Sequence, residues 1–269
     1  MKNQGKFVLG LLVGAAVVII VVGMFSVVSF GSTIAVIRIK GTISSSPSFL
    51  FETTTPHDIL PLIERVEEDP SIRGVLFEID SPGGSVVASR EIAYGIRRME
   101  KPKVCWMGDI AASGAYWIAS SCDHIMADPL TLTGSIGATA SYLEFSELFE
   151  KYGITYEQIT SGERKDTGTP FRNITEEERD KMQYIIDEIF RYFLDDVRES
   201  RSLTEEQAEQ ISSGDVFLAK DAVEMGLIDS LGTMRDAKER VKEMSGAEYA
   251  EFVELKSGGL SLLDLLGLM

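Results

Sequence analysis

The sequence predicts an α/β domain whose sheet is largely parallel. Short and nearly continuous apolar runs, such as 75–79 and 103–107, are typical of strands that are buried on both faces. Segments with the periodicity of amphipathic helices alternate with these runs, for example 58–68 and 85–99. Strands that alternate with helices in this way indicate a parallel sheet covered by helices.

The elements can be assigned in order along the chain. In the first half we predict strands at 33–40, 75–79, 103–107 and 125–127, and helices at 58–68, 85–99 and 113–120. In the middle of the chain we predict two more strands, at 136–141 and 155–160, on either side of a helix at 144–152.

The C-terminal part of the sequence is predicted to be mainly helical. Thr175 and Glu178 form a capping box at the start of a long helix that runs to Arg198, and Thr204 with Gln207 opens the next helix. A third helix is predicted at 218–225, closed by a glycine and followed by a short strand-like segment at 227–229.

The N-terminal segment is a candidate membrane anchor, because residues 7–30 contain no charged side chain. At ~1.5 Å per residue, a helix of this length exceeds the ~30 Å hydrocarbon core, so one tilted transmembrane helix fits. The alternative is a cleaved signal peptide, but its apolar region usually has only ~7–15 residues, and no Ala-x-Ala site follows here.

The basic residues around this segment predict its orientation. Lys2 and Lys6 precede the span and Arg38 is the first basic residue after it, so the positive-inside rule places the N-terminus in the cytoplasm. We therefore expect a single-pass protein of the cell membrane with its main domain outside the cytoplasm. The predicted divisions are the N-terminus and anchor at 1–30, one domain at 31–257, and an apolar tail at 258–269.

Charge and cysteine content exclude several functions. Lys2 and Lys6 are the only charges before residue 31, so the outer part has a formal net charge of about −18, which disfavours nucleic acid as a partner. Cys105 and Cys122 lie in apolar surroundings and could pair, but free buried thiols are favoured. No cysteine or histidine spacing indicates a metal site, and no cofactor is expected.

A serine and two glycine-containing turns carry the chemical signal. Ser113 lies among small residues at the predicted start of a helix, where it could be a nucleophile or only a helix N-cap. Gly83 and Gly84 follow a predicted strand, where backbone N–H groups could form an oxyanion hole or the pair could be an ordinary turn.

The choice of general base is less clear from the sequence. Neither of the two histidines, His57 and His124, lies in a glycine-rich or strand-end context, which favours a lysine. A lysine with an ordinary pKa of ~10.4 is protonated at neutral pH. A lysine that acts as a base must therefore be shielded from water by the fold, because burial lowers its pKa. Lys165, between Arg164 and Asp166 in a polar loop, looks like a solvated surface charge from the sequence alone.

Four segments, taken together and in this order, resemble the signal peptide peptidase A family of serine–lysine peptidases. They are 80–85 (DSPGGS), 112–117 (ASGAYW), 131–137 (TLTGSIG) and 161–166 (SGERKD). The resemblance covers roughly 33–240 and implies the ββα spiral of the Clp protease and crotonase fold, preceded here by one transmembrane helix.

The resemblance also implies roles for individual residues. Ser113 would be the nucleophile and Lys165 the general base, with Ser135 hydrogen-bonded to the lysine. The N–H groups of Gly84 and Gly114 would form the oxyanion hole. Two positions depart from the family: Ala115 stands where many relatives have a second glycine, and Arg164 beside the base is unexpected.

The implied function is a membrane-anchored serine endopeptidase that degrades signal-peptide remnants and other apolar peptides. Short family members build the active-site groove from neighbouring subunits, so a ring-like homo-oligomer is expected. A non-catalytic scaffold, with Ser113 only capping a helix, is the alternative. A crotonase-type acyl-CoA enzyme is disfavoured by the outward orientation. The tail at 258–269 could cover its own subunit, or occupy a substrate groove and compete with substrate.

Overall fold

The computed structural model describes residues 32–257. The predicted membrane anchor and the C-terminal tail lie outside this range. Among the described residues, no helix combines the length and the apolar character needed to cross a bilayer.

The centre of the molecule is a parallel sheet, as the sequence predicted. Its strands follow the order β10 (Glu251–Glu254), β1 (Thr33–Lys40), β4 (Ile72–Ser81), β5 (Lys103–Ala112), β6 (His124–Ala127) and β9 (Ser230–Leu231), and every neighbouring pair is parallel. These short apolar strands can lie side by side because the sheet is covered on both faces.

The sheet divides along β5. The first part of β5 pairs with β6, and its last residues, Ile110–Ala112, pair with β7 (Leu132–Gly134). β7 in turn pairs antiparallel with β8 (Val216–Leu218). A separate small ribbon joins β2 (Thr42–Ile43) to β3 (Thr53–Thr54). The carboxyl end of β5 is therefore surrounded by strands from distant parts of the chain.

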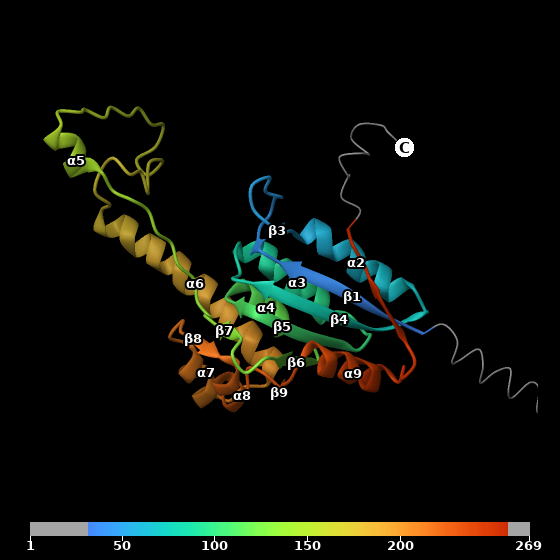
Figure 1. Cartoon of the computed structure of the whole chain (residues 1–269). Coiled ribbons are helices and arrows are strands. Elements are labelled where there is room, and N and C mark those ends of the chain that lie inside the picture. The colour runs from blue at the N-terminus through green and yellow to red at the C-terminus, as the bar shows by residue number, and fades with distance from the viewer. Residues whose placement is uncertain (1–31, 258–269) are drawn as a thin grey trace, which may run out of the picture.

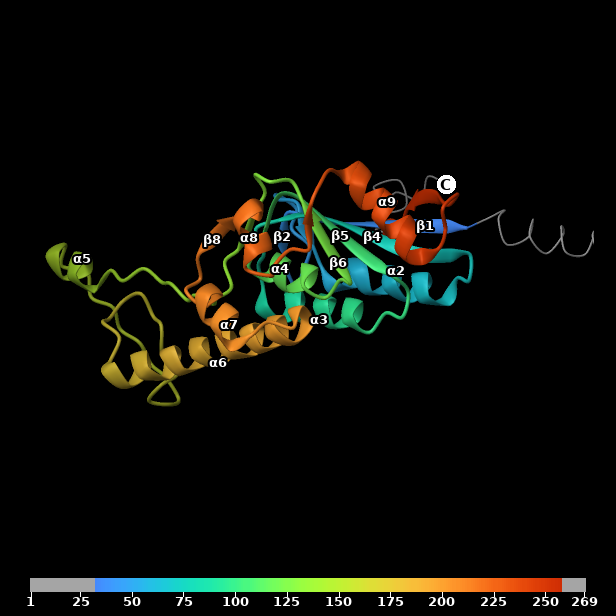
Figure 2. The same cartoon turned by 90° about the horizontal axis from the view of Figure 1, so that it is seen from below.

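Alternating side chains of β1 show how the two layers of helices are attached. Ala35, Ile37 and Ile39 belong to one buried cluster, whereas Ile34 and Val36 belong to another. The first cluster includes the helices α2 (Pro56–Glu68), α3 (Val86–Arg97) and α4 (Gly114–Ala119), and the second includes α9 (Met234–Ser245). Figures 1 and 2 show these helices on opposite faces of the sheet.

The remaining helices extend the α4 side. α6 (Glu176–Arg201) is followed by α7 (Glu205–Ile211) and α8 (Ala219–Glu224). The capping boxes predicted for α6 and α7 are both formed, by Thr175 with Glu178 and by Thr204 with Gln207. Each box satisfies amide groups that the first turn of a helix leaves without partners.

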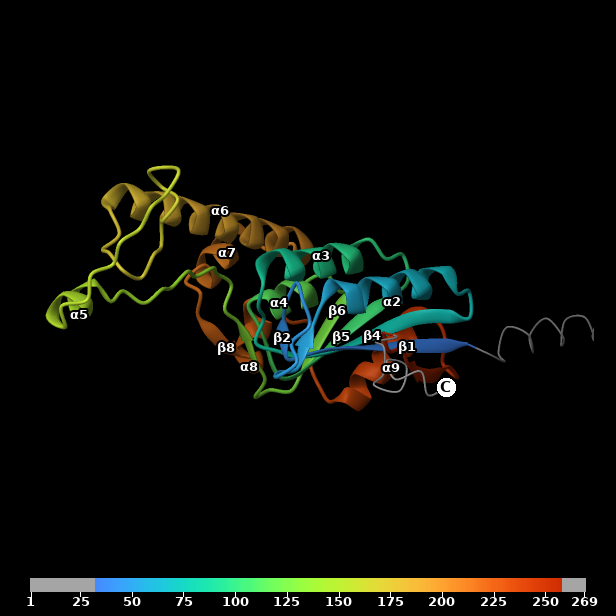
Figure 3. The ribbon, with the colours of Figure 1, turned by 90° about the horizontal axis from the view of Figure 1, so that it is seen from above.

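One segment projects from this body, and we call residues 138–175 the arm. It contains the short helix α5 (Ser146–Lys151) and otherwise irregular backbone. Figure 3 shows that it extends, together with the first turns of α6, away from the sheet. Phe171 packs against Phe149 and Tyr156 at centroid distances of 5.3 and 4.4 Å, so the arm has a small aromatic cluster of its own.

The strands predicted at 136–141 and 155–160 are wrong. The nearby strand is β7, at Leu132–Gly134, and the second segment is irregular. Ile136 is buried in the core, but Tyr156 and Ile159 of the second segment are exposed, and Ile159 is fully exposed. The apolar and β-branched residues of these segments suggested strands, but the arm leaves the sheet, so no strand within residues 32–257 lies beside the second segment for it to pair with.

Smaller differences concern the ends of elements. β5 continues to Ala112, five residues beyond the predicted end, and β9 lies just after the predicted 227–229. Cys105 and Cys122 are buried and free, as favoured, and burial raises the pKa of the Cys105 thiol.

Candidate active site

Ser113 lies at a sharp turn between the end of β5 and the start of α4. Its backbone has φ 53° and ψ −127°, a region that residues with a side chain rarely adopt. The turn is held on both sides: the Ser113 amide donates to the carbonyl of Gly134 at 2.8 Å, and the Trp117 amide donates to the carbonyl of Ser113 at 3.0 Å. Strained backbone conformations that the surrounding structure holds in place are concentrated at functional sites.

The side chain of Ser113 does not cap the helix that follows it. Ser113 occupies the N-cap position of α4, but its hydroxyl makes no capping hydrogen bond. By contrast, Thr55, Thr175, Thr204 and Thr233 all accept capping bonds at their helices. The capping role that the sequence left open is therefore absent, and the hydroxyl is available for another task.

The turn at Gly83–Gly84 lies directly against Ser113. A Cβ atom built on Gly83 would stand 2.7 Å from the amide nitrogen of Gly114 and 2.9 Å from the Cβ of Ser113. On the other side, β2 fixes the turn, because the Ile43 amide donates to the Gly83 carbonyl and the Ser85 amide donates to the Ile43 carbonyl. This close approach of two backbones requires glycine.

The amides of Gly84 and Gly114 are free to bind a ligand. Within residues 32–257, neither N–H group donates to an acceptor of the chain. Both residues line the same cavity as Ser113, and Gly84 is exposed. Two unpaired N–H groups beside a serine are the arrangement that an oxyanion hole requires.

The cavity beside Ser113 has a volume of about 380 Å³ and one apolar side. The residues that line it and carry polar groups include Gly84, Ser113, Gly114, Ser135 and Thr139. The apolar side consists of Val86, Trp117, Ile186, Ile189 and Phe193. Trp117 of α4 stacks on Phe193 of α6 at 4.4 Å and donates from its indole nitrogen to Asp196, so α6 is fixed as one wall.

The structure brings together four of the five predicted site residues. Ser135, which follows β7, also has a positive φ (51°), and its amide donates to the carbonyl of Asp215 at 2.7 Å. Lys165 is the exception: it is exposed on the arm and does not line the cavity. Within one copy of the chain, the predicted base therefore stands apart from the predicted nucleophile.

A serine–histidine pair occurs elsewhere in the structure. Nε2 of His124 and Oγ of Ser230 are 2.8 Å apart, and burial lowers the pKa of His124. Neither residue lines the cavity of Ser113. The pair joins β6 to β9, which is a structural role. No group of three or more potential metal ligands occurs within residues 32–257.

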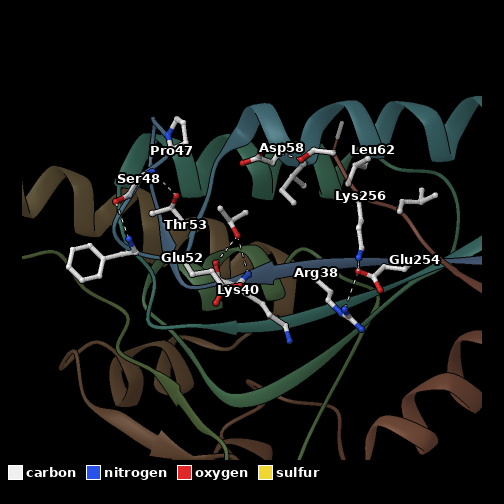
Figure 4. Close-up of a pocket in the computed structure, with 15 residues that line it drawn as sticks. Arg38, Lys40, Pro47, Ser48, Glu52, Thr53, Asp58, Leu62, Glu254 and Lys256 are labelled. Carbon is white, nitrogen blue, oxygen red and sulfur yellow. Dashed lines mark hydrogen bonds and ion pairs between the residues drawn. The ribbon is translucent and has the colours of Figure 1, made fainter. Parts of the chain in front are cut away.

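A larger cavity, of about 670 Å³, lies at the edge of the sheet beside β1 (Figure 4). All of its basic side chains form ion pairs, with Glu78 of β4 or with Glu254. Arg38 contacts Glu78 at 2.8 Å and Glu254 at 3.0 Å, and Lys40 contacts Glu78 at 3.0 Å. These ion pairs give the basic side chains a structural role, so the smaller cavity beside Ser113 is the better candidate active site.

Sequence reasoning missed the wall that α6 contributes. Ile186, Ile189 and Phe193 were recognisable as the apolar face of a helix, but their periodicity does not show against what the face packs. Gly137, Ala138 and Thr139 also line the cavity, in a segment that the sequence predicted as a strand.

The fold and this site define a peptidase class with a ClpP-like α/β fold and a serine at a strand–helix turn. A family model described as peptidase family S49 matches residues 96–248. This match includes Ser113, Ser135, Lys165 and α6. The chain belongs to peptidase family S49, and the resemblance noted from the four segments is confirmed.

Named relatives agree with this assignment. The chain is 34% identical over 195 residues to a candidate protease of Methanocaldococcus jannaschii, covering 72% of this chain and 63% of that protein. It is 32% identical to a candidate signal peptide peptidase of Enterococcus faecium, covering 78% and 62%. It is 31% identical to Protease 4 of Haemophilus influenzae, covering 78% of this chain but only 34% of that protein.

A solved structure supports the fold. A lysine-to-alanine mutant of the 1510-N membrane-bound stomatin-specific protease, in complex with a substrate peptide, matches with a TM-score of 0.54 and 17% identity. The match covers 88% of this chain and 96% of that one. At this level of identity the likeness concerns the fold.

Proposed function

We propose that this chain is a serine endopeptidase in which Ser113 is the nucleophile and Lys165 the general base. The observation that carries the proposal is the position of Ser113, strained and uncapped, beside the free amides of Gly84 and Gly114. Membership of a peptidase family gives the reaction type, and the lysine follows from the family motif at 161–166.

The proposed reaction has two steps. Lys165, as the neutral amine, takes the proton from Ser113 while Oγ attacks the carbonyl carbon of the scissile peptide bond. The negative charge that develops on the carbonyl oxygen is stabilised by the amides of Gly84 and Gly114. The amine product leaves with the proton, and an ester to Ser113 remains. Water, activated by the same lysine, then hydrolyses this acyl-enzyme.

The apolar side of the cavity supports apolar peptides as substrates. Val86, Trp117, Ile186, Ile189 and Phe193 would surround a substrate side chain next to the scissile bond. Binding there removes apolar surface from water on both partners, at roughly 25 cal/mol per Å². Segments of cleaved signal peptides have this chemistry, and we propose them as the substrate class.

We further propose that Lys165 reaches Ser113 of a neighbouring subunit in a ring-like homo-oligomer. Lys165 is carried by the arm, which extends away from its own sheet (Figure 1). The arm also exposes large apolar side chains, including Leu143, Tyr152 and Ile159, with 71%, 69% and 101% exposure. A second copy of the chain would cover these side chains and dry the surroundings of the lysine.

The membrane location remains part of the proposal. β1 begins at Thr33, three residues after the apolar segment at 7–30, so the sheet would follow almost directly after the anchor. With the N-terminus in the cytoplasm, the peptidase domain would lie outside it, next to the membrane that holds apolar peptides.

Two variants test the proposed function. Ser113→Ala and Lys165→Ala should each abolish hydrolysis of an apolar fluorogenic peptide and leave the melting temperature unchanged, because the two groups act as one unit. Ser113→Ala should also prevent labelling by a fluorophosphonate probe. A non-catalytic scaffold predicts no probe labelling of the wild type. Substantial hydrolysis by Lys165→Ala at neutral pH would show that the base is misassigned.

A further inference from the structure

The loop that carries Lys165 is attached to α6 by a three-residue ion cluster. Arg172 donates to both oxygens of Asp166, from Nε at 2.8 Å and from Nη2 at 2.9 Å. The same guanidinium donates to both oxygens of Glu178, from Nη1 at 2.9 Å and from Nη2 at 2.6 Å. One arginine therefore holds two carboxylates in bidentate geometry, which is the strongest form of such pairing.

Glu178 connects this cluster to the start of α6. Its carboxylate accepts from the amide and the hydroxyl of Thr175, which completes the capping box of the helix. It also accepts from the hydroxyl of Thr167 at 3.0 Å. The Glu178 side chain is only 7% exposed, although it is charged. A buried carboxylate with this many donors fixes the backbone around it.

The cluster attaches to the two residues that directly follow Lys165, while Arg164 before it forms a separate, exposed ion pair with Glu177 of α6. Asp166 is held by Arg172, and Thr167 is held by Glu178. The turn itself is closed by backbone bonds from Lys165 to Gly162 at 3.1 Å and from Thr169 to Asp166 at 2.9 Å. The two residues after Lys165 thus contact the cluster, while Lys165 is exposed.

The charges of the cluster persist at neutral pH. Hydrogen bonds from Arg172 hold the pKa values of Asp166 and Glu178 below their usual range, and those carboxylates raise the pKa of Arg172. The guanidinium also neutralises much of the negative charge that would otherwise stand beside Lys165.

We propose that Arg172, held by Asp166 and Glu178, is a positioning residue that fixes the loop of Lys165 on the end of α6. This inference rests on the proposed role of Lys165 as base. A lysine side chain is long and flexible, so its amine reaches a defined point only if its backbone is fixed. A misplacement of about 1 Å can cost about 100-fold in rate.

The test compares three variants of the full chain with the wild type. Arg172→Gln should lower kcat for an apolar peptide by about 10- to 100-fold, with KM changed less than about twofold, because the substrate cavity is formed elsewhere. Arg172→Lys keeps the positive charge but not the planar guanidinium that binds both carboxylates, so its kcat should recover only in part. Glu177→Gln is the matched control: it also removes an ion pair between this loop and α6, but both side chains of that pair are exposed, so it contributes little and kcat should stay unchanged.

The pH profile separates positioning from simple loss of structure. In Arg172→Gln, the negative charges of Asp166 and Glu178 are no longer balanced by the guanidinium. The other charged residues near the loop, Glu163, Arg164 and Glu177, are unchanged. Added negative charge beside a general base favours its protonated form, so the pH of half-maximal kcat should move upward. Glu178→Gln, which can keep the capping box, should lower kcat without this upward movement.

The possible outcomes distinguish this inference from the proposed function. If Lys165→Ala is inactive but Arg172→Gln retains wild-type kcat and pH profile, the positioning role is wrong and the base assignment stands. An active Lys165→Ala variant would overturn both. A fall in kcat together with an earlier melting transition and an unmoved pH profile would assign Arg172 a purely structural role and also reject the inference.

Discussion

At the scale of single residues, the site depends on how closely two backbone turns approach. A Cβ atom on Gly114 would stand 2.2 Å from the Oγ of Ser89, which is buried and makes no hydrogen bond in the structure. Gly114→Ala should therefore destabilise the domain by about 1–3 kcal/mol, as overpacking does, and displace an amide of the proposed oxyanion hole. Thermal or urea unfolding measures the first effect and kcat the second.

A second substitution checks the cause of that destabilisation. Ser89→Gly removes both Ser89 side-chain atoms that the new methyl group would meet. In the double variant with Gly114→Ala, much of the lost stability should return. If the double variant is no more stable than the sum of the two single changes predicts, the clash is not the reason.

The ion cluster of the arm predicts a response to acid. Hydrogen bonds from Arg172 lower the pKa of Glu178, with a smaller lowering from the Thr175 amide, and Arg172 likewise lowers the pKa of Asp166. A carboxylate with a lowered pKa stabilises the folded form above its unfolded pKa, and this contribution is lost as pH falls toward the folded value. The arm should therefore be fixed at neutral pH and loosen progressively below about pH 4.

Hydrogen exchange followed by mass spectrometry can measure this loosening. Amides at 162–178 should lose protection below about pH 4, after correction for intrinsic rates, while β4 and β5 remain protected. In Arg172→Gln, the loosening should already be present at neutral pH. Protection in the arm that is equal at pH 7 and pH 3 would contradict the prediction.

The residues predicted from the sequence differ in how well local rules locate them. Ser113, Gly84 and Ser135 each follow a strand, and parallel neighbouring strands end at one edge of a sheet, so the sheet itself brings these residues together. Lys165 lies in an irregular loop whose direction no periodicity encodes. The cluster of Arg172, Asp166 and Glu178 was likewise not foreseen, because only the contact of Thr175 with Glu178 follows a local rule.

At the scale of elements, α6 serves both the cavity and the arm. Near its start it anchors the loop of Lys165, and further along it supplies Ile186, Ile189 and Phe193 to the cavity. The contact of Trp117 with Phe193 and Asp196 fixes this second part on α4. In the proposed mechanism, the same helix would therefore limit the size of the substrate side chain and position the base.

A prediction about substrate selectivity follows from this wall. Ile189→Phe should narrow the cavity and reduce kcat/KM for peptides with leucine before the scissile bond, relative to those with alanine, by about tenfold. Ile185→Phe, an exposed position one residue before Ile186, is the matched control and should leave the ratio unchanged. An unaltered leucine-to-alanine ratio of kcat/KM in Ile189→Phe would show that this part of α6 does not contact the substrate.

The elements of the body could be predicted and those of the arm could not, for a physical reason. β1, α2, β4, α3 and β5 have apolar faces that pack on each other within the same chain, so their periodicity matches their burial. In the arm, the large apolar and aromatic side chains of Ile154, Tyr156 and Ile159 suggest a buried segment but are exposed. Apolar residues at regular spacing predict burial only where the segment packs on its own chain. A segment that projects from the body can carry the same residues in exposed positions.

At the scale of the whole molecule, the separation of Lys165 from Ser113 makes a definite prediction. In a ring with heterologous contacts, each site combines the cavity of one subunit with the arm of the next. Ser113→Ala and Lys165→Ala subunits are then each inactive alone, but they can form intact sites where a Lys165→Ala subunit, which retains Ser113, meets the arm of a Ser113→Ala subunit, which retains Lys165.

The experiment mixes the two inactive proteins after dissociation and allows them to reassemble. With random assembly at equal amounts, half of the serines and half of the lysines are intact, so about a quarter of the wild-type activity should return. The double variant carrying both substitutions, mixed with wild type in the same way, controls for dilution. If the two single variants stay inactive together although mass measurement shows that they co-assemble, then the serine and the lysine act within one chain, and the arm must fold back onto its own body to bring them together.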